Sequence, residues 1–254
     1  MSLIYINPYS FAAAGGNWTP AQITTELWFD AADSSTITTA GGSVSQWNDK
    51  SGNARNATQA TAANQPAHST TGFNGLPGVT FDGVNDTMLH SLNIGGPFSL
   101  VAVYKTGLLQ GTYRGIMAVG PGNSSGNLML MRTFGGRIGS YGSSDIDSTV
   151  SYASGQTAMV IVEDDNASGT KTFWINGSSS GTYTQNPIGQ ATAHIGGHAN
   201  DSQQAAMTLA ECLALPGIPT TTNRQLVEGY LAHKWALTGS LPAGHPYKTT
   251  APTI

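Results

Sequence analysis

The feature that most constrains the fold is a repeated pattern of short strand-like runs separated by turn residues. Runs of roughly five to eight residues rich in Val, Ile, Phe, Tyr and Thr alternate with clusters of Gly, Asn, Ser and Asp along most of the chain. The sequence lacks the strand–helix alternation that builds a parallel nucleotide-binding sheet. It therefore predicts an all-β fold, a two-sheet antiparallel sandwich.

The individual runs predict where the strands lie. We expect strands at residues 27–30, 78–81, 98–105, 115–119, 128–134, 137–141, 158–163, 171–175, 181–184, 191–195 and 208–215. The run 98–104 is largely apolar on both alternating faces, which is typical of a strand covered on both sides in the middle of a sandwich. Asn176-Gly177 follows another run and favours a tight hairpin turn.

One stretch near the C-terminus has helical periodicity. Thr222 and Gln225 fit a capping box at its start. Apolar residues then recur on one stripe: Leu226, Val227, Tyr230, Leu231 and Trp235. We expect one short C-terminal amphipathic helix that packs this stripe against the sandwich.

Composition excludes two classes of partner. Charged residues make up 9% of the chain, the net charge is −4, and the 10 Lys and Arg residues are scattered, so no basic surface for nucleic acid is expected. The longest apolar runs, such as 98–104 and 158–162, are far shorter than the roughly 18 residues that span a bilayer, so no membrane partner is expected. The single cysteine, Cys212, excludes an internal disulfide framework.

The first twenty residues differ from the rest, because an apolar segment there leads into the Ala/Gly run 12–16. We expect an N-terminal arm at residues 1–20 and a single lectin-like β-sandwich domain at residues 21–254. The arm docks either on the chain's own sandwich or on a neighbouring subunit. The N-terminal residues show no basic leader and no long apolar run, so synthesis in a host cytoplasm without a signal peptide is expected.

Two motifs of catalytic type are present. Gly122-Asn123-Ser124-Ser125-Gly126 matches the G-x-S-x-G pattern, but a strand is expected after it where a nucleophile elbow needs a helix. His194 and His198 have helical ligand spacing, yet two glycines lie between them, and an extended chain would place them about 13 Å apart. Both motifs are interpreted as loop features.

Acidic residues offer the other route to catalysis. The run Glu163-Asp164-Asp165 is interpreted as solvated carboxylates of a hairpin turn rather than the carboxylate pair of a glycosidase. Glu211 shares an alternating register with Leu209 and Leu213, so we expect it on one strand face with them, partly buried. It is interpreted as a structural acid bonded to backbone, with a functional acid of shifted pKa as the alternative. No catalytic residue is assigned, and the chain is not expected to be an enzyme.

A loop after one expected strand offers oxygen ligands. Asp82, Asn85 and Asp86 are candidates for calcium, which prefers six to eight oxygens. An Asx-type turn, in which these side chains bond their own backbone, is the alternative. No metal site and no cofactor is assigned, and calcium stays the one alternative.

Several segments, taken together and in order, resemble a known family. They are LWFDAAD (27–33), WNDKSGN (47–53), FNGLP (73–77), FDGVND (81–86), LAECL (209–213), EGYLAHKW (228–235), LP (241–242) and HPY (245–247). This set, which spans residues 25–250, resembles the concanavalin-A-like, laminin-G-type jelly-roll domains of bacterial and phage structural proteins. The resemblance implies two packed sheets, often with glycan binding and sometimes with calcium. The E-x-D-x-x-E strand of the family's glucanases is missing, which argues against hydrolysis.

The resemblance and the low charge together predict a non-enzymatic phage virion structural protein. Such a lectin-like domain would decorate the capsid surface, with the major capsid protein, other virion proteins and further copies of itself as partners and host glycans as a ligand. Two alternatives stay open: a tail-associated receptor-binding lectin, and a carbohydrate-binding module of a bacterial protein. Trp47, Tyr141 and Trp174 are the candidates for stacking on sugar rings, with a place in the core as the alternative for each tryptophan.

Overall fold

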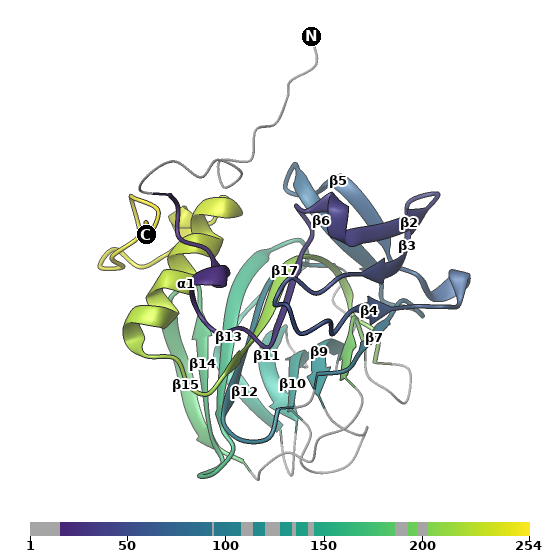
Figure 1. Ribbon diagram of the computed structural model, residues 1–254. Coiled ribbons are helices and arrows are strands. Elements are labelled where there is room, and N and C mark those ends of the chain that lie inside the picture. The colour runs from purple at the N-terminus through teal and green to yellow at the C-terminus, as the bar shows by residue number, and fades with distance from the viewer. Residues whose placement is uncertain are drawn as a thin grey trace.

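In its described residues the protein is a two-layer antiparallel β-sandwich with one α-helix against its side (Figure 1). The computed structural model describes residues 16–92, 94–107, 114–119, 128–133, 136–141, 145–185, 193–197 and 203–254, with the backbone alone at 128–133, 141 and 145. The predicted fold, a concanavalin-A-like jelly roll with a C-terminal helix, is confirmed. The G-x-S-x-G segment and His198 lie outside the described residues.

One layer, the helix-side sheet, is built around β17. In spatial order it contains β15 (Ser178–Thr184), β14 (Thr170–Ile175), β13 (Thr157–Asp165), β8 (Phe98–Thr106), β17 (Ala206–Pro216), β6 (Leu76–Asp82) and β5 (Ala67–Phe73). Strand β1 (Leu27–Asp30) pairs with the second half of β17, beyond the point where β6 ends.

The other layer, the far sheet, contains the remaining strands. In spatial order these are β12 (Asp145–Ser151), β11 (Arg137–Tyr141), β10 (Leu128–Thr133), β9 (Arg114–Val119), β16 (Ala193–Ile195), β7 (Met88–His90), β4 (Ala57–Thr58), β3 (Ser43–Trp47) and β2 (Ile37–Ala40). The two layers join at one corner, where Ser43 pairs with Ala67.

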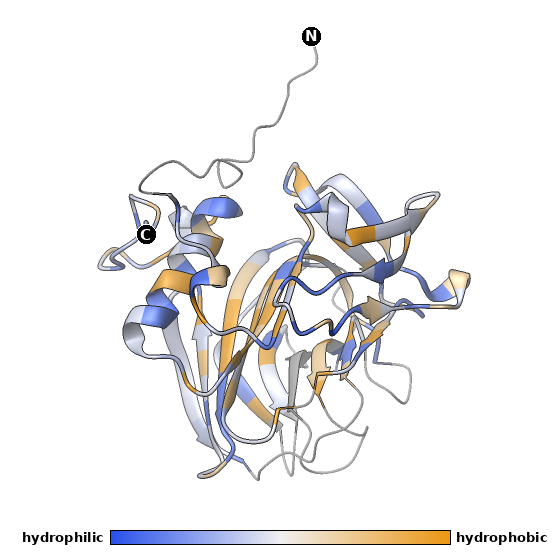
Figure 2. Ribbon diagram, in the orientation of Figure 1, coloured by the Kyte–Doolittle hydropathy of each residue, from blue (hydrophilic) through white to orange (hydrophobic). Residues whose placement is uncertain are grey.

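The central strand is β8, which pairs with β13 on one side and with β17 on the other. Its residues are buried from Phe98 to Tyr104, so the prediction of a strand covered on both sides is confirmed. Figure 2 shows hydrophobic residues concentrated on the strands in the middle of the molecule, with paler and bluer loops around them. The strands that the sequence did not predict, β2, β3, β4, β5, β7 and β12, include short or Ser/Thr-rich segments with exposed residues.

The Asn-Gly dipeptide between β14 and β15 forms the expected tight turn. Asn176 and Gly177 both have positive φ, at 50° and 80°, as a type I′ turn requires. Asn74 and Gly75 connect β5 and β6 with nearly the same angles, 51° and 85°. Both hairpins therefore end in turns that place an asparagine at the tip.

Helix α1 spans Thr221–Lys234 and packs against the helix-side sheet. Its N-cap is Thr220, whose side chain accepts from the Asn223 amide, so the predicted cap at Thr222 is wrong by two residues. Because three threonines stand in a row, local sequence does not decide which one caps the helix. In the described part of the chain, no helix has the length and apolar character needed to cross a membrane.

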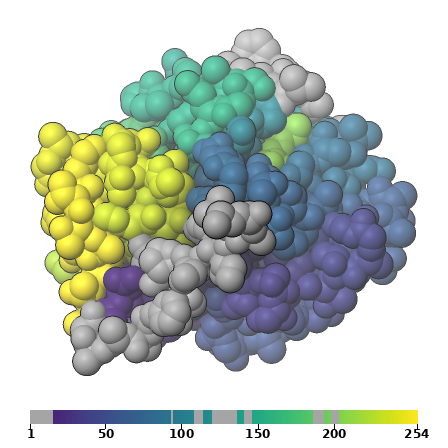
Figure 3. All heavy atoms as spheres, turned by 90° about the horizontal axis from the view of Figure 1, so that it is seen from above, coloured from purple at the N-terminus to yellow at the C-terminus, as the bar shows by residue number. Residues whose placement is uncertain are grey.

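The two ends of the described chain meet. Asn17 forms a β-bridge with Thr253, the Trp18 amide donates to Pro252, and Trp18 is buried beside Tyr230 of α1. The 3₁₀ turn η2 (Pro20–Gln22) follows directly. In Figure 3 the purple early residues lie against the yellow C-terminal part. Residues 16–18 of the predicted arm therefore pack on the chain's own C-terminal tail.

Candidate functional site

The three aromatic candidates lie in different environments. Trp47 is completely buried, with its ring 5.4 Å from that of Phe29, so no ligand can stack on it. Trp174 is half-buried on the outer face of β14, and the Arg224 guanidinium lies 3.3 Å from its ring centre. One face of that indole is therefore already covered. The side chain of Tyr141 lies outside what the structure describes.

The calcium candidates form a turn that is closed on itself. Asp82 Oδ1 accepts from the backbone amides of Val84, Asn85 and Asp86 at 2.8, 3.2 and 3.3 Å, and Asp86 Oδ2 accepts from the Asp82 amide at 2.9 Å. This is the Asx-type alternative. Across the described residues, no group of three or more His, Cys, Asp and Glu side chains could hold a metal ion.

The acidic run at the end of β13 is more buried than the sequence suggested. Strand β13 continues to Asp165, so Glu163 and Asp164 are buried strand residues, and the prediction of solvated turn carboxylates is wrong for both. Asp164 forms an ion pair of 2.6 Å with Lys171, and both side chains are fully buried. Asp165 fits the turn prediction, because it accepts from Ser168 and the Ala167 amide.

The surroundings of Glu211 differ from the expected ones. It is completely buried and accepts from the indole nitrogens of Trp28 and Trp235, the Tyr230 hydroxyl and the Lys234 ammonium, at 2.6 to 3.0 Å. A structural acid was predicted, but its partners are side chains rather than backbone.

A β-bulge explains where Glu211 points. The register of β17 on β8 shifts between Leu209, which pairs with Tyr104, and Glu211, which pairs with Val103. Adjacent residues of β8 point to opposite faces, so the bulge turns Glu211 to the face opposite Leu209. The predicted shared face of Leu209 and Glu211 is therefore wrong, and the acid faces α1.

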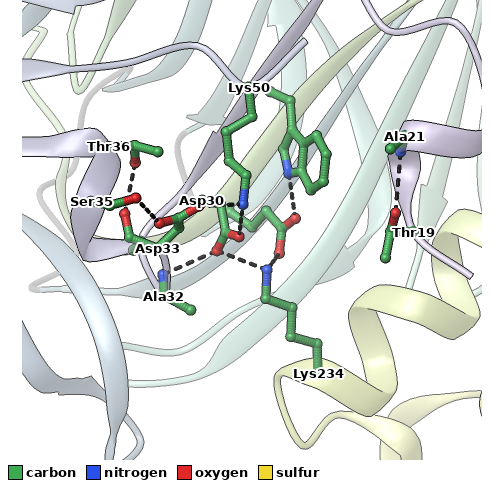
Figure 4. A network of polar contacts seen from close by, with 12 residues as sticks. Thr19, Ala21, Asp30, Ala32, Asp33, Ser35, Thr36, Lys50 and Lys234 are labelled. Carbon is green, nitrogen blue, oxygen red and sulfur yellow. Dashed lines mark hydrogen bonds and ion pairs between the residues drawn. The ribbon is translucent and has the colours of Figure 1, made fainter. Parts of the chain in front are cut away.

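Charges around Glu211 form a closed network (Figure 4). Lys234 lies 2.7 Å from both Asp30 and Glu211, and Lys50 lies 2.9 and 2.8 Å from Asp30 and Asp33. Burial raises the pKa of Glu211, which Lys234 opposes. Burial also acts to raise the pKa of Asp30, but the two ammonium groups outweigh it and hold this pKa below its usual range. Each charged group in this network is paired with one of opposite sign. The network therefore holds α1 against the sheet, and we assign no catalytic role to its residues.

A second charged cluster joins α1 to the C-terminal tail. Arg224 lies 3.8 Å from Glu163 and 3.3 Å from Glu228, and His245 Nε2 lies 3.0 Å from the other oxygen of Glu228. Burial raises the pKa of Glu228 to about 7, with Arg224 opposing. These groups are buried, so this cluster, like the network around Glu211, holds elements of the fold together.

The described residues line a groove at one end of the sandwich, which we call the end groove. It has a volume of about 620 Å³. It is lined by the tip of the β5–β6 hairpin, the segment between β12 and β13, the β14–β15 turn and the 3₁₀ turn η5 (Thr238–Ser240). Its lining residues are Asn74, Val150, Ser151, Tyr152, Gly155, Gln156, Thr157, Ile175, Asn176, Ser178 and Ser240. This volume lies within the range of small-ligand sites.

The end groove offers amides and hydroxyls beside an apolar part formed by Val150, Tyr152 and Ile175. Among its described lining residues none is charged. Gln156 Oε1 accepts from the Ala153 amide at 2.7 Å, and Asn176 Oδ1 accepts from the Met159 amide at 2.9 Å, which leaves the amide nitrogens as donors. The sequence reasoning missed this site, because the two Asn-Gly turns mark only part of its rim and the other lining segments lie far away in the chain.

Comparison with known proteins identifies the fold alone. No family model and no curated protein matches the chain. Among solved structures, domain 4 of the arabinanase AbnA from Geobacillus stearothermophilus, in complex with arabinotriose, has a TM-score of 0.57 at 14% identity, over 78% of this chain and 95% of that one. Trypanosoma rangeli sialidase has a TM-score of 0.56 at 14% identity, over 82% of this chain and 32% of that one.

The botulinum neurotoxin serotype D binding domain is also similar, with a TM-score of 0.53 at 13% identity, over 81% of this chain and 50% of that one. The chain thus spans about a third of the sialidase chains and nearly all of the arabinanase domain. These likenesses and the sheet order show that the chain has an antiparallel β-sandwich fold.

Proposed function

We propose that the chain is a non-catalytic carbohydrate-binding domain that holds an uncharged glycan segment in the end groove. The observation that carries this proposal is the lining of that groove, where amides and hydroxyls surround an apolar part. Amide and hydroxyl groups pair with sugar hydroxyls, and apolar side chains pack on the C–H faces of sugar rings. The solved AbnA domain, which contains arabinotriose, lends support at the level of the fold.

The described lining of the end groove has no charged residue, which favours sugar binding over sugar hydrolysis. Glycoside hydrolysis needs two carboxyl groups roughly 5 to 10 Å apart across the bound sugar. The buried acids Glu163, Glu211 and Glu228 are engaged by Arg224 or Lys234 and do not line the end groove. We therefore propose binding without turnover.

A glycan array followed by titration calorimetry tests this proposal. Ser240→Trp fills the groove and should abolish binding, whereas Ser91→Trp, at an exposed site elsewhere, should not. Gln156→Glu keeps the oxygen that accepts from Ala153 but removes the donor, so it should weaken binding, while Gln225→Glu on α1 serves as its control. Equal affinities in the chain and in Ser240→Trp would overturn the assignment of the site.

A finer proposal concerns where such a domain works. The low charge and the family resemblance support a virion protein that decorates the capsid surface, with tail attachment as the second candidate. Immunogold microscopy on particles released by the producing host separates these. Gold on heads supports capsid decoration, and gold on tail tips supports a receptor-binding lectin. Unlabelled particles would contradict both and favour a carbohydrate-binding module of a cellular protein.

A further inference from the structure

His245 holds the C-terminal tail through two hydrogen bonds that fix its protonation. The Tyr247 amide donates to Nδ1 at 3.2 Å, so Nδ1 carries no proton. The neutral ring must therefore carry its proton on Nε2, which donates to Glu228 at 3.0 Å. Adding a proton to Nδ1 would place two donors face to face, and the bond to Tyr247 would be lost.

The segment that His245 holds also supports the end groove. The His245 ring, Leu241 and Pro242 approach Gly177 so closely that a Cβ there would lie 3.1 to 3.2 Å from them. Gly177 lies between Asn176 and Ser178, two lining residues of the groove. Lys248, three residues after His245, donates to the carbonyls of Gly239 and Leu241, which flank the lining residue Ser240.

Charged and titratable groups around His245 come from several elements. On α1 these are Glu228, Arg224 and His233, which contacts the Tyr247 carbonyl through Nε2 at 2.9 Å. Lys248 lies on the tail itself, and Glu163 of β13 faces Arg224. Burial, followed by the charges of Arg224 and Lys248, holds the pKa of His245 below its ordinary value. Glu228, with a pKa of about 7, gains its proton at higher pH than His245 does.

We propose that His245 makes the end groove sensitive to acid, because its second proton releases the tail and loosens the groove wall. In acid the Tyr247 contact breaks, Lys248 shifts with it, and both Ser240 and the β14–β15 turn lose their support. Sugar binding therefore weakens as the pH falls. The binding half of this proposal rests on the proposed function, and the release of the tail does not.

Hydrogen exchange measured by mass spectrometry tests the release without any ligand. We compare peptides covering residues 174–180 and 238–248 at pH 7.5 and pH 4.5, after correction for intrinsic exchange rates. Both peptides should lose protection in acid, while the central strand β8 should not. In His245→Asn the side-chain oxygen can still accept from Tyr247 and does not titrate, so protection should be the same at both pH values. Unchanged protection in the unmodified chain would overturn the proposal.

Calorimetry with the glycan found on the array then tests the coupling. Affinity should fall about fivefold or more between pH 7.5 and pH 4.5, and His245→Asn should remove this dependence. His68→Asn, on β5 outside the groove, and Glu228→Gln should both keep it. Loss of the dependence in Glu228→Gln with retention in His245→Asn would assign the titration to Glu228 and overturn the proposal. Loosening of the tail without glycan binding at any pH would contradict the proposed function alone.

Discussion

At the scale of single residues, the buried charges around Glu211 make the sharpest stability prediction. Lys234→Met should lower the free energy of unfolding by about 3–5 kcal/mol, because it leaves two buried carboxylates facing each other. Lys105→Met removes a half-buried lysine from β8 and should change it by no more than about 0.5 kcal/mol. Urea denaturation measures both. Similar losses in the two variants would show that Lys234 does not hold this network together.

Glu211 also shows which features of a buried acid could be predicted from the sequence and which could not. Its position among apolar strand residues was enough to predict a structural acid. Its real partners lie on β1, on α1 and at the C-cap of α1, and its orientation depends on a bulge that no local pattern marks. Which side chains meet a buried acid depends on how distant elements dock, so such a network follows from the fold and not from the strand that contains the acid.

Glu228 gives a prediction about pH. Its pKa is raised from 4.5 to about 7 by burial, so its contribution to stability is present below pH 4.5 and is lost as the pH rises through 7. Glu228→Gln does not titrate. Relative to the unmodified chain, this variant should therefore gain up to about 3 kcal/mol of unfolding free energy between pH 4.5 and pH 8. A constant difference across urea titrations at several pH values would contradict the raised pKa.

At the scale of elements, the two Asn-Gly hairpins form a matched pair. Gly75→Ala introduces a side chain at positive φ into open space and should cost about 1–2 kcal/mol. Gly177→Ala carries the same backbone strain and also presses on Leu241, Pro242 and His245, so its cost should be larger. Urea denaturation of both variants measures these costs, and the difference between them gives the contribution of the contact between Gly177 and the tail. Equal costs would mean that the tail yields freely and does not support the turn.

The two hairpins also show which secondary-structure elements could be predicted from the sequence. Strands with β-branched or aromatic runs and Asn-Gly turns were predictable, because both signals are local. Strands β2 and β5 were missed, since they are rich in Ser and Thr and have hardly any buried residues. The end groove could not be predicted from any of them, because four segments far apart in the chain line it.

At the scale of the whole molecule, the described residues 16–18 and the C-terminal tail hold each other in place. The Trp18 amide donates to Pro252, the Ile254 amide donates to Gly16, and the Trp18 side chain, which is 5% exposed, packs beside Tyr230. Burial of such a side chain stabilises by about 1.5–3 kcal/mol, so Trp18→Ala should lower the melting temperature by on the order of 3–12 °C. Scanning calorimetry measures this fall, and an unchanged melting temperature would show that Trp18 does not hold these two segments together.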